Sequence, residues 1–443
     1  MGTGRGEIPS VYRAGSRSKL VLTACACAAA AIAGVGAPSV ADAARLRSKL
    51  PLVAIRTAKT IPDDPKVAAR VRVIDRPGRR ANRTSDPGNV YAGRAGIELR
   101  GHSSQLFPKK QYGLELRDRK GDGRDAALLG MPADDDWVLS ANYSDKTLMR
   151  NALAYRTART VFGRYAPQTR HVELVLNGRY RGVYVLTQKI ELGEGRVEAE
   201  DGWMLELVFG YQARGERHFR SPWTGRPLIF TDPDDPNRRQ ARAIRRDVVR
   251  FERALYGKRF RHLRLGWRSR LEPRAAVDYV LLQELFGNQD AFHASTYFYR
   301  PPGGRIVMGP LWDFDIAMGN TTLDRFRTPP GWHLGARPYV ERLYRDRGFV
   351  RAMAARWREL RRAGLRGQLR AMIASDARQL SGPQARNFQR WRILGRYVWP
   401  NPVDPRTGRY RPTWRAEIAY LKRWLDARIT WIDRALPARA RRG

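Results

Sequence analysis

Acidic residues at two places in the chain are of a type and spacing that could bind a metal ion. Asp313 and Asp315 follow the apolar run Pro310-Leu311-Trp312, and Asp290 ends the segment Gly287-Asn288-Gln289-Asp290 after a predicted helix. Carboxylates two positions apart on an extended segment point to the same face, so Asp313 and Asp315 can share one metal ion. A turn, which Gly319 permits nearby, would leave that geometry open.

Oxygen ligands of this kind suit Mg²⁺ or Mn²⁺ better than zinc, and a magnesium site usually needs only one or two carboxylates together with phosphate oxygens. A nucleoside triphosphate would be the natural ligand. The alternative is structural: Asp290 caps a turn, and Asp313 pairs with one of the many arginines. Spacing alone leaves both interpretations open.

A second segment has the residue types that bind phosphate. It lies between two predicted strands. Arg100 supplies a positive charge, Gly101 backbone donors, Ser103 and Ser104 hydroxyls, and Lys109 and Lys110 a pair of ammonium groups. Amides and hydroxyls in a loop can surround a phosphate group, and an ammonium can hold it. Only 11 of the 83 basic residues are lysines, which sets the pair apart from the background, although a solvated turn is the alternative.

Several other chemistries have no support in the sequence. The six histidines show no zinc spacing, and no His-Glu-x-x-His, Gly-x-Ser-x-Gly, Walker or dinucleotide glycine motif is present. Glu173, Glu191 and Glu206 follow or lie in apolar strands, where we expect them to face solvent or pair with arginine. The tryptophans of the last hundred residues are expected to pack in a helical core.

Elements that could position these residues follow from the hydrophobic pattern. Apolar and polar residues alternate in segments that predict strands, at 95–100, 112–117, 171–176, 182–189, 203–209, 296–300 and 305–308. Asn177-Gly178 between two of them predicts a hairpin. The remainder of 192–238 is rich in Gly, Pro and Asp and predicts a long loop or insertion.

Helices are predicted mainly in the second half of the chain. A helix with a hydroxyl cap is expected to start at Ser144-Asp145-Lys146-Thr147. Further helices are predicted at 237–256, 273–287, 349–364, 366–380 and 413–436. Because the predicted strands come mainly first and the predicted helices mainly last, we expect an α+β fold with two lobes, a β-rich N-terminal part and an α-rich C-terminal part.

The charge of the chain predicts attraction to polyanions. The 443 residues include 83 Lys and Arg against 43 Asp and Glu, a formal net charge of +40. Nucleic acid, anionic surface polymers, anionic lipid, acidic proteins and nucleoside phosphates all qualify as partners. We do not expect nucleic acid, because no nucleic-acid motif is present and the N-terminus indicates export.

The first residues predict export. Basic residues, among them Arg13, Arg17 and Lys19, precede the uncharged run at 20–37, and Ala41-Asp42-Ala43 offers a signal-peptidase site, so residues 1–43 are expected to form a signal peptide. A retained anchor and a lipid-modified Cys25 are the alternatives. Cys25 and Cys27 both lie in this segment, so the mature chain would have no cysteine. The expected location is the cell surface or the medium, with no membrane-spanning segment beyond the signal.

Six motifs in order resemble the CotH family of spore-coat and secreted proteins. They are Leu99-Arg100-Gly101-His102-Ser103-Ser104, Lys109-Lys110-x-Tyr112-x-Leu114, Asp136-Trp137-x-Leu139 with Asp145-Lys146 and Arg150-Asn151, Leu176-Asn177-Gly178 with Gly182-x-Tyr184, Asn288-x-Asp290, and Trp312-Asp313-x-Asp315. The resemblance covers residues 95–436. It implies an atypical protein-kinase-like fold that binds ATP and Mg²⁺ (or Mn²⁺) between two lobes and phosphorylates Ser or Thr on secreted or cell-surface proteins.

The resemblance also implies roles for the candidate residues. Asp290 matches the catalytic-loop aspartate that orients or deprotonates the acceptor hydroxyl. Asp313 matches the metal-binding aspartate, and Asp315 supports the metal or its water shell. Lys110, or failing that Lys109, would hold ATP phosphates, while Arg100, Ser103 and Ser104 would line the phosphate loop.

Two departures from the family pattern bear on activity. Ser295-Thr296 stand where the family usually has an asparagine that binds a second metal ion, and Gln188-Lys189 stand where a glutamate usually precedes the lysine. The alternative function is therefore a non-catalytic cell-surface protein, a pseudokinase or an adhesin, that binds a polyanionic partner. The expected domains are a signal peptide (1–43), an N-terminal extension with the first strands (44–94), a CotH-like kinase domain (95–436) and a basic tail (437–443).

Overall fold

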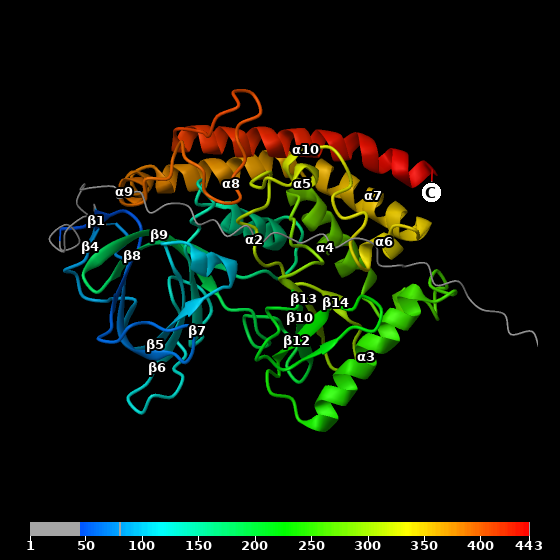
Figure 1. The fold of residues 1–443 in the computed structure, drawn as a ribbon, viewed down its shortest axis with the longest axis horizontal. Coiled ribbons are helices and arrows are strands. Elements are labelled where there is room, and N and C mark those ends of the chain that lie inside the picture. Colours follow the sequence, from blue (N-terminus) through cyan, green and yellow to red (C-terminus); the bar gives the residue numbers. More distant parts are fainter. Residues whose placement is uncertain (1–44, 79–80, 443) are drawn as a thin grey trace, which may run out of the picture. The chain divides into compact units, whose positions relative to one another are not determined.

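Seven strands in the first half of the chain close into a barrel. The computed structural model describes residues 45–78 and 81–442 (Figure 1), so the predicted signal peptide and both cysteines lie outside the described residues. The barrel order is β2-β3-β5-β6-β7-β9-β8, with β2 parallel to β8 and the other pairs antiparallel. Its strands are β2 (Leu52–Arg56), β3 (Val67–Ile74), β5 (Tyr91–Arg100), β6 (Gln111–Arg117), β7 (Asp136–Ser140), β8 (Thr169–Leu176) and β9 (Arg179–Gln188).

The barrel has its own apolar interior. Alternate residues of its strands, such as Ile97, Leu114 and Leu186, are fully buried in one hydrophobic cluster. The predicted strands at 95–100 and 112–117 are confirmed, as is the hairpin β8–β9 around Asn177 and Gly178. Closure of the sheet was not predicted, and it removes the exposed edges that an open sheet of these strands would have.

A second sheet of five strands has the order β11-β12-β10-β13-β14. Its members are β10 (Trp203–Leu207), β11 (His218–Arg220), β12 (Pro227–Asp232), β13 (Thr296–Arg300) and β14 (Val307–Met308). The prediction of a long loop after 209 is wrong, because β11 and β12 lie there. Both strands are short and flanked by Gly, Pro and Asp, so neither shows enough alternation to be recognised. A small pair, β1 (Arg47–Ser48) with β4 (Asn82–Arg83), stands apart from both sheets.

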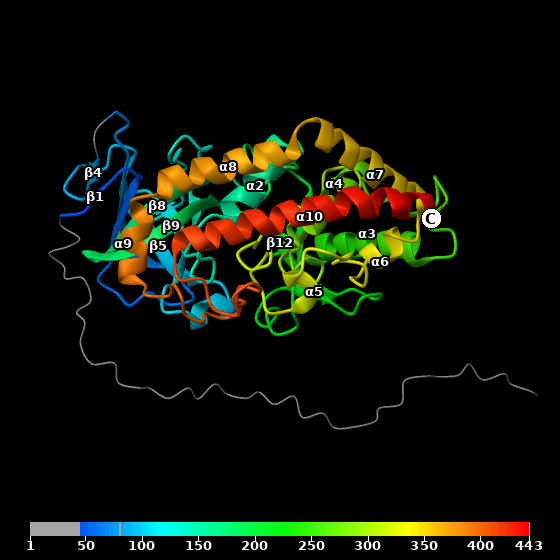
Figure 2. The same cartoon turned by 90° about the horizontal axis from the view of Figure 1, so that it is seen from above.

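Helices dominate the second half, as predicted. They are α2 (Arg150–Thr160), α3 (Arg238–Tyr256), α4 (Pro273–Phe286), α5 (Asp324–Arg327), α6 (Val340–Leu343), α7 (Arg347–Arg362), α8 (Leu365–Leu380), α9 (Pro383–Arg390) and α10 (Trp414–Arg442), with short 3₁₀ turns η1 (Ser103–Leu106) and η2 (Trp267–Ser269). In Figures 1 and 2, α10 lies along α8 and α7. These helices share a large hydrophobic core with α2, α4 and the second sheet.

The start of α2 differs from the prediction. The helix begins at Arg150, and its N-cap residue, Met149, has no capping side chain. The carboxylate of Asp145 instead accepts hydrogen bonds from the backbone N–H groups of Thr147 (3.0 Å) and Arg150 (2.8 Å). The guanidinium of Arg150 also pairs with Asp145, and both side chains are fully buried. A buried carboxylate and its arginine, rather than a hydroxyl, therefore organise the turn before α2.

The fold is mixed α and β, with a barrel, a second sheet and a helical part. The barrel core and the larger core of the helices are separate clusters, but the described residues belong to one compact unit and two lobes are not confirmed. In the described part of the chain, each helix is either too short or too polar to cross a membrane.

Candidate active site

A cavity of about 440 Å³ brings together residues from the barrel, the second sheet and the helical part. Six of the eight residues expected to bind the nucleotide or metal ion or to act in catalysis line it: Arg100, Ser103, Ser104, Asp290, Asp313 and Asp315. They come from segments separated by almost 200 residues in the sequence. The cavity is therefore the candidate active site.

The end of α4 places Asp290 at this cavity. Gly287 ends the helix with a left-handed backbone, at φ 54°. A Cβ there would lie 2.7 Å from the Nδ1 atom of His333, so glycine is needed for close packing as well. The Asn288 side chain then accepts a hydrogen bond from the Asp290 N–H (3.1 Å) and donates one to the Asp313 carbonyl (3.2 Å). Asn288 thus joins the two acidic segments.

The segment with Asp313 and Asp315 is not extended but turns, which is the second of the two geometries that the sequence left open. Asp313 has a left-handed backbone, at φ 60°, which non-glycine residues rarely adopt outside functional or structurally constrained sites. Two side chains of α2 hold this turn: the Tyr155 hydroxyl accepts from the Asp313 N–H (3.1 Å), and Asn151 accepts from the Phe314 N–H (2.6 Å). Both carboxylates nevertheless reach the cavity.

The three aspartates affect one another electrostatically. Burial in the cavity raises the pKa of Asp290, and the nearby charge of Asp315 raises it further, while Arg337 opposes the shift. Burial and the charge of Asp290 raise the pKa of Asp313, and burial and Asp313 raise that of Asp315. A hydrogen bond from the Ser144 hydroxyl (3.1 Å) partly offsets the last shift. Carboxylates that repel one another in a partly dry site would be stabilised by a cation.

This donor set fits Mg²⁺ or Mn²⁺. Asp313 and Asp315 offer oxygen ligands side by side, and a magnesium ion needs only one or two carboxylates when phosphate oxygens and water complete its shell. Within residues 45–78 and 81–442, no group of three or more His, Cys, Asp or Glu is arranged to hold a metal ion. The two carboxylates fit an ion that shares its coordination shell with phosphate oxygens and water.

A cation and a polar turn line another part of the cavity. Arg100 is the last residue of β5, and its guanidinium lies 5.9 Å from the centre of the Trp312 ring. Gly101 follows with φ 90°, and a Cβ there would come within 2.1 Å of the Ser104 hydroxyl. The backbone and the hydroxyls of Ser103 and Ser104 thus gather at one point of the lining. Such a turn offers hydrogen-bond donors to an anion.

The two lysines lie elsewhere. Neither Lys109 nor Lys110 lines the cavity. The Lys109 ammonium is buried and donates to the Val183 carbonyl (2.5 Å) and to Asn387 of α9 (3.0 Å), and the Lys110 ammonium donates to the Gln105 carbonyl. The structure therefore does not bring these two residues together with the other candidates, and nucleotide binding by either lysine stays a prediction.

The buried Lys109 should give the protein a characteristic pH dependence. Burial lowers the pKa of Lys109 to about 7, from a usual value of 10.5, although Asp145 opposes the shift. Between these two pH values the unfolded chain binds more protons at this position than the folded chain, so stability rises with pH. We expect the unfolding free energy of the wild type, minus that of Lys109→Met, to rise from pH 7 to pH 9 by at most about 1.4 kcal/mol per pH unit. Urea denaturation at each pH measures this difference.

Lys120, which is exposed, supplies the control for that experiment. The difference between the wild type and Lys120→Met should stay constant across the same pH range. An equally constant difference for Lys109→Met would mean that Lys109 keeps its ordinary pKa in the folded protein.

Glu206 is the main residue of the cavity that sequence reasoning missed. It was expected to face solvent or pair with arginine, but it lines the cavity and accepts a hydrogen bond from the Tyr297 hydroxyl (2.9 Å). Burial raises its pKa to about 7. For the other two glutamates, the expected pairing with arginine is confirmed: Glu173 pairs with Arg386 (2.6 Å), and Glu191 pairs with Arg196 (3.1 Å). No local signal separates Glu206 from them, because only the second sheet places it at the cavity.

The lining is acidic although the chain is strongly basic. Among the described residues that form it are one arginine, Arg100, one histidine, His102, and eight carboxylates: Asp63, Asp64, Glu98, Glu206, Glu216, Asp290, Asp313 and Asp315. Burial lowers the pKa of His102, which favours its neutral form. A free polyanion would be repelled from this cavity, whereas an anion that brings metal cations would be accepted.

Asn151 should be needed for the stability of the turn. Phe314 is completely buried, so loss of the Asn151 acceptor leaves its backbone N–H without a partner. We expect Asn151→Ala to lower the unfolding free energy by about 1–3 kcal/mol, measured by urea denaturation. Thr160→Ala, at an exposed position of the same helix, should change it by less than about 0.5 kcal/mol. Equal effects of the two substitutions would contradict the assigned role.

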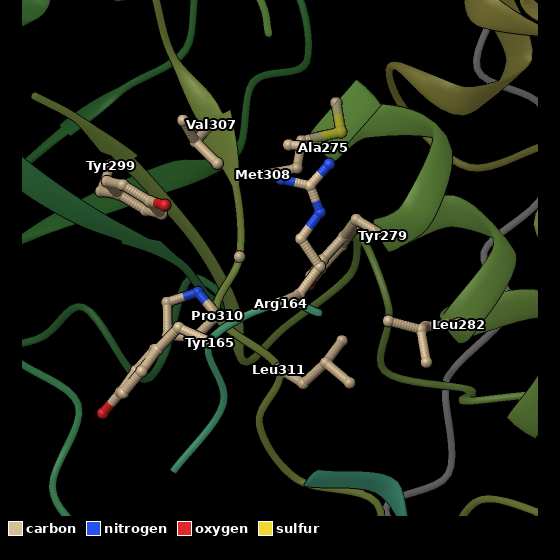
Figure 3. Close-up of a pocket in the computed structure, with 11 residues that line it drawn as sticks. Arg164, Tyr165, Ala275, Tyr279, Leu282, Tyr299, Val307, Met308, Pro310 and Leu311 are labelled. Carbon is tan, nitrogen blue, oxygen red and sulfur yellow. The ribbon is translucent and has the colours of Figure 1, made fainter. Parts of the chain in front are cut away.

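A second cavity, behind the Pro310-Leu311 segment, is too small for a nucleotide. Its volume is about 40 Å³, and Figure 3 shows its lining of Arg164, three tyrosines (Tyr165, Tyr279 and Tyr299) and neighbouring apolar side chains. A space of this size holds one or a few water molecules. It is therefore part of the packing behind the site.

A mixed α/β fold that gathers paired carboxylates, an arginine and a serine-bearing turn in one cavity is typical of proteins that bind phosphate groups together with a divalent cation. The chain belongs to the CotH kinase family: the model of the CotH kinase protein family matches residues 97–432, about three-quarters of the sequence. This confirms the resemblance inferred from the motifs. A comparison with curated proteins finds no match. Membership of this family suggests a phosphotransferase function.

Proposed function

We propose that the protein is an exported, Mg²⁺-dependent protein kinase that transfers the γ-phosphoryl group of ATP to Ser or Thr hydroxyls of secreted or cell-surface proteins. The observation that carries the proposal is the meeting of Asp290, Asp313 and Asp315 in one cavity with Arg100. Family membership supports the reaction class. The predicted signal peptide supports the location.

Asp290 is proposed as the group that receives the proton of the acceptor hydroxyl. As the hydroxyl oxygen forms a bond to the γ-phosphorus, the bond from that phosphorus to the bridging oxygen of ADP breaks. Transfer of this kind needs positioning and charge stabilisation more than covalent chemistry. A raised pKa makes Asp290 a better proton acceptor than an exposed aspartate, because its carboxylate is more basic.

The remaining residues are assigned to the nucleotide and the metal ion. Asp313 and Asp315 would hold Mg²⁺ or Mn²⁺, which when bound neutralises charge on the phosphates. Arg100 would pair with a phosphate oxygen, and Ser103 and Ser104 would donate hydrogen bonds to others. Because Lys109 and Lys110 point elsewhere, Arg100 is the cation for which the cavity supports this role.

Ser295 stands where the family usually has asparagine, and it also lines the cavity. A hydrogen bond with its side chain lowers the pKa of Asp313 in part, against the larger effects of burial and Asp290. A hydroxyl offers a weaker ligand oxygen than a carboxamide. A second metal ion is therefore proposed to bind weakly or not at all.

The alternative function is a pseudokinase that binds a polyanionic partner at the cell surface. The net charge of +40 favours such a partner. The acidic lining of the candidate site opposes it there, so a polyanion would have to bind another part of the protein.

The test is a calorimetric titration of the protein with ATP, with and without Mg²⁺, beside an assay of labelled γ-phosphate transfer to the protein itself and to a serine-rich acceptor. Mg²⁺-dependent binding together with transfer would support the kinase. Binding without transfer to either acceptor would favour the pseudokinase. Absence of nucleotide binding would overturn both the kinase and the assigned site.

A further inference from the structure

A basic cavity lies away from the candidate active site, where the start of α7 meets the end of α10. Its volume is about 670 Å³, and it shares no residue with the active-site cavity. Four arginines and two aromatic rings take part in the lining: Arg261, Arg345, Arg347, Arg439, Trp332 and Tyr344. Among the described residues that line it, none is acidic. We call it the arginine pocket.

The arginine pocket is partly preformed. The guanidinium of Arg439 lies 4.5 Å from the centre of the Tyr344 ring and 5.2 Å from that of Trp332, which holds its position over the aromatic floor. The hydroxyl of Tyr344 is fixed by a hydrogen bond to Glu284 (2.8 Å). Crowding of positive charge is also visible at the neighbouring Arg342, whose pKa is lowered first by burial and then by Arg345 and Arg261. An anion in the pocket would relieve this repulsion.

The loop that follows α3 adds two exposed leucines beside the arginine pocket. Leu263 is 74% exposed and Leu265 is 52% exposed, large fractions for leucine in a folded protein. The Arg261 guanidinium donates to the Arg345 carbonyl (2.7 Å), which attaches the loop to the edge of the pocket. In Figures 1 and 2, the loop after α3 lies at the same end of the fold as the end of α10. The loop also carries Lys258, Arg259 and Arg264, all exposed.

We propose that this end of the protein docks on a lipid bilayer with anionic, phosphate-bearing headgroups. The arginine pocket would bind headgroup phosphate, and Leu263 and Leu265 would enter the boundary between headgroups and acyl chains. Basic residues around a short apolar projection form the combination that an anionic membrane surface recognises. A soluble polyanion would use the arginines but would leave both leucines in water.

The test is cosedimentation of the full chain with vesicles of phosphatidylcholine alone, or of phosphatidylcholine and phosphatidylglycerol at about 7:3, at two salt concentrations. The full chain keeps its N-terminal segment in every sample, so its contribution cancels when each variant is compared with the wild type on the same vesicles. We expect tighter binding to the anionic vesicles, weakened by salt. Arg345→Gln/Arg347→Gln should weaken it by about fivefold per arginine, the effect of one basic residue near an anionic surface.

Leu263→Ser/Leu265→Ser should weaken vesicle binding by roughly tenfold, because the leucines can no longer bury apolar surface. The matched control for Arg345→Gln/Arg347→Gln is Arg119→Gln/Lys120→Gln. It removes the same charge from exposed positions between β6 and β7 and should change binding by less than about twofold. Asp313→Asn should bind vesicles like the wild type, so this test does not depend on the kinase proposal.

Two outcomes would overturn the membrane proposal. Binding to anionic vesicles that is unchanged by the leucine substitutions would mean that the leucines do not enter the bilayer. Binding of inorganic tripolyphosphate at the arginine pocket, measured by its loss in Arg345→Gln/Arg347→Gln, together with no preference for anionic vesicles, would instead identify a site for a soluble polyphosphate.

Discussion

Replacing Asp313 with asparagine should abolish Mg²⁺-dependent ATP binding and lower phosphoryl transfer by roughly 10³-fold, the upper range for loss of one preorganised electrostatic group. The reason is the position of this residue: its carboxylate lies in the cavity beside Asp315, on a turn fixed by Tyr155 and Asn288. Asparagine keeps the shape of the side chain and tolerates a left-handed backbone, so the turn should persist. Calorimetry with ATP and a transfer assay measure the two effects separately.

Asp290→Asn should act differently at the same site. It should lower transfer by about 10²–10⁴-fold, the usual contribution of a general base, while Mg²⁺-dependent ATP affinity stays within about twofold of the wild type. The difference follows from the proposed roles, since Asp290 contacts the acceptor and Asp313 the metal ion. Asp122→Asn, at an exposed position between β6 and β7, controls for the change from Asp to Asn and should alter neither quantity.

The pair of variants separates the possible functions. Loss of ATP binding in Asp313→Asn with no transfer in the wild type indicates a pseudokinase. Normal ATP binding and transfer in both variants would mean that the cavity is not the active site. The kinase with these roles is supported only by a third pattern, in which the wild type transfers phosphate, Asp313→Asn loses ATP binding and both variants lose transfer.

The acidic residues of the site could be predicted because their motifs are local. Asp290 follows a helix that ends at glycine, and Asp313 and Asp315 lie in one short segment, so residue type and spacing were enough to single them out. The shape of the second segment was not predictable. A left-handed Asp313 is imposed by Tyr155 and Asn151, about 160 residues earlier in the chain.

The lysines and Glu206 show the opposite case. Lys109 and Lys110 have the right residue type before a strand, but the direction of their side chains depends on partners as distant as Asn387. Glu206 resembles Glu173 in sequence, yet one meets Tyr297 at the cavity and the other meets Arg386. The sequence identifies the residue type at each position, whereas tertiary packing determines which groups its side chain contacts.

The same distinction applies to the fold. The hairpin around Asn177 and Gly178 is a local structure and was predicted with its turn. Closure of the barrel needs parallel pairing of β2 with β8, whose paired residues Val53 and Leu174 are 121 positions apart. No turn signal joins strands at that distance. The alternating pattern therefore predicted strands but could not show that their sheet has no free edge.

Arg428→Met should cause a large loss of stability, about 3–5 kcal/mol, because it leaves a buried carboxylate without its cation. The Arg428 side chain of α10 and the Glu284 side chain of α4 are both 0% exposed, and they pair at 2.7 Å. Arg428 also donates to the carbonyls of Pro329 and Gly331, at 2.6 Å each. Urea denaturation measures the loss. Arg434→Met, at an exposed position of α10, should change stability by less than about 0.5 kcal/mol.

The double variant Arg428→Met/Glu284→Gln tests the cause. If the uncompensated charge of Glu284 accounts for the loss, removal of that charge should recover part of it, and the two substitutions will not be additive. A loss that is purely additive would indicate packing as the cause instead.

The outcome also concerns the active site, because Glu284 lies three residues before Gly287, which turns the chain toward Asp290. Since the Arg428 side chain also donates to the Glu284 carbonyl (2.8 Å), α10 stabilises the end of α4 that positions the proposed catalytic aspartate.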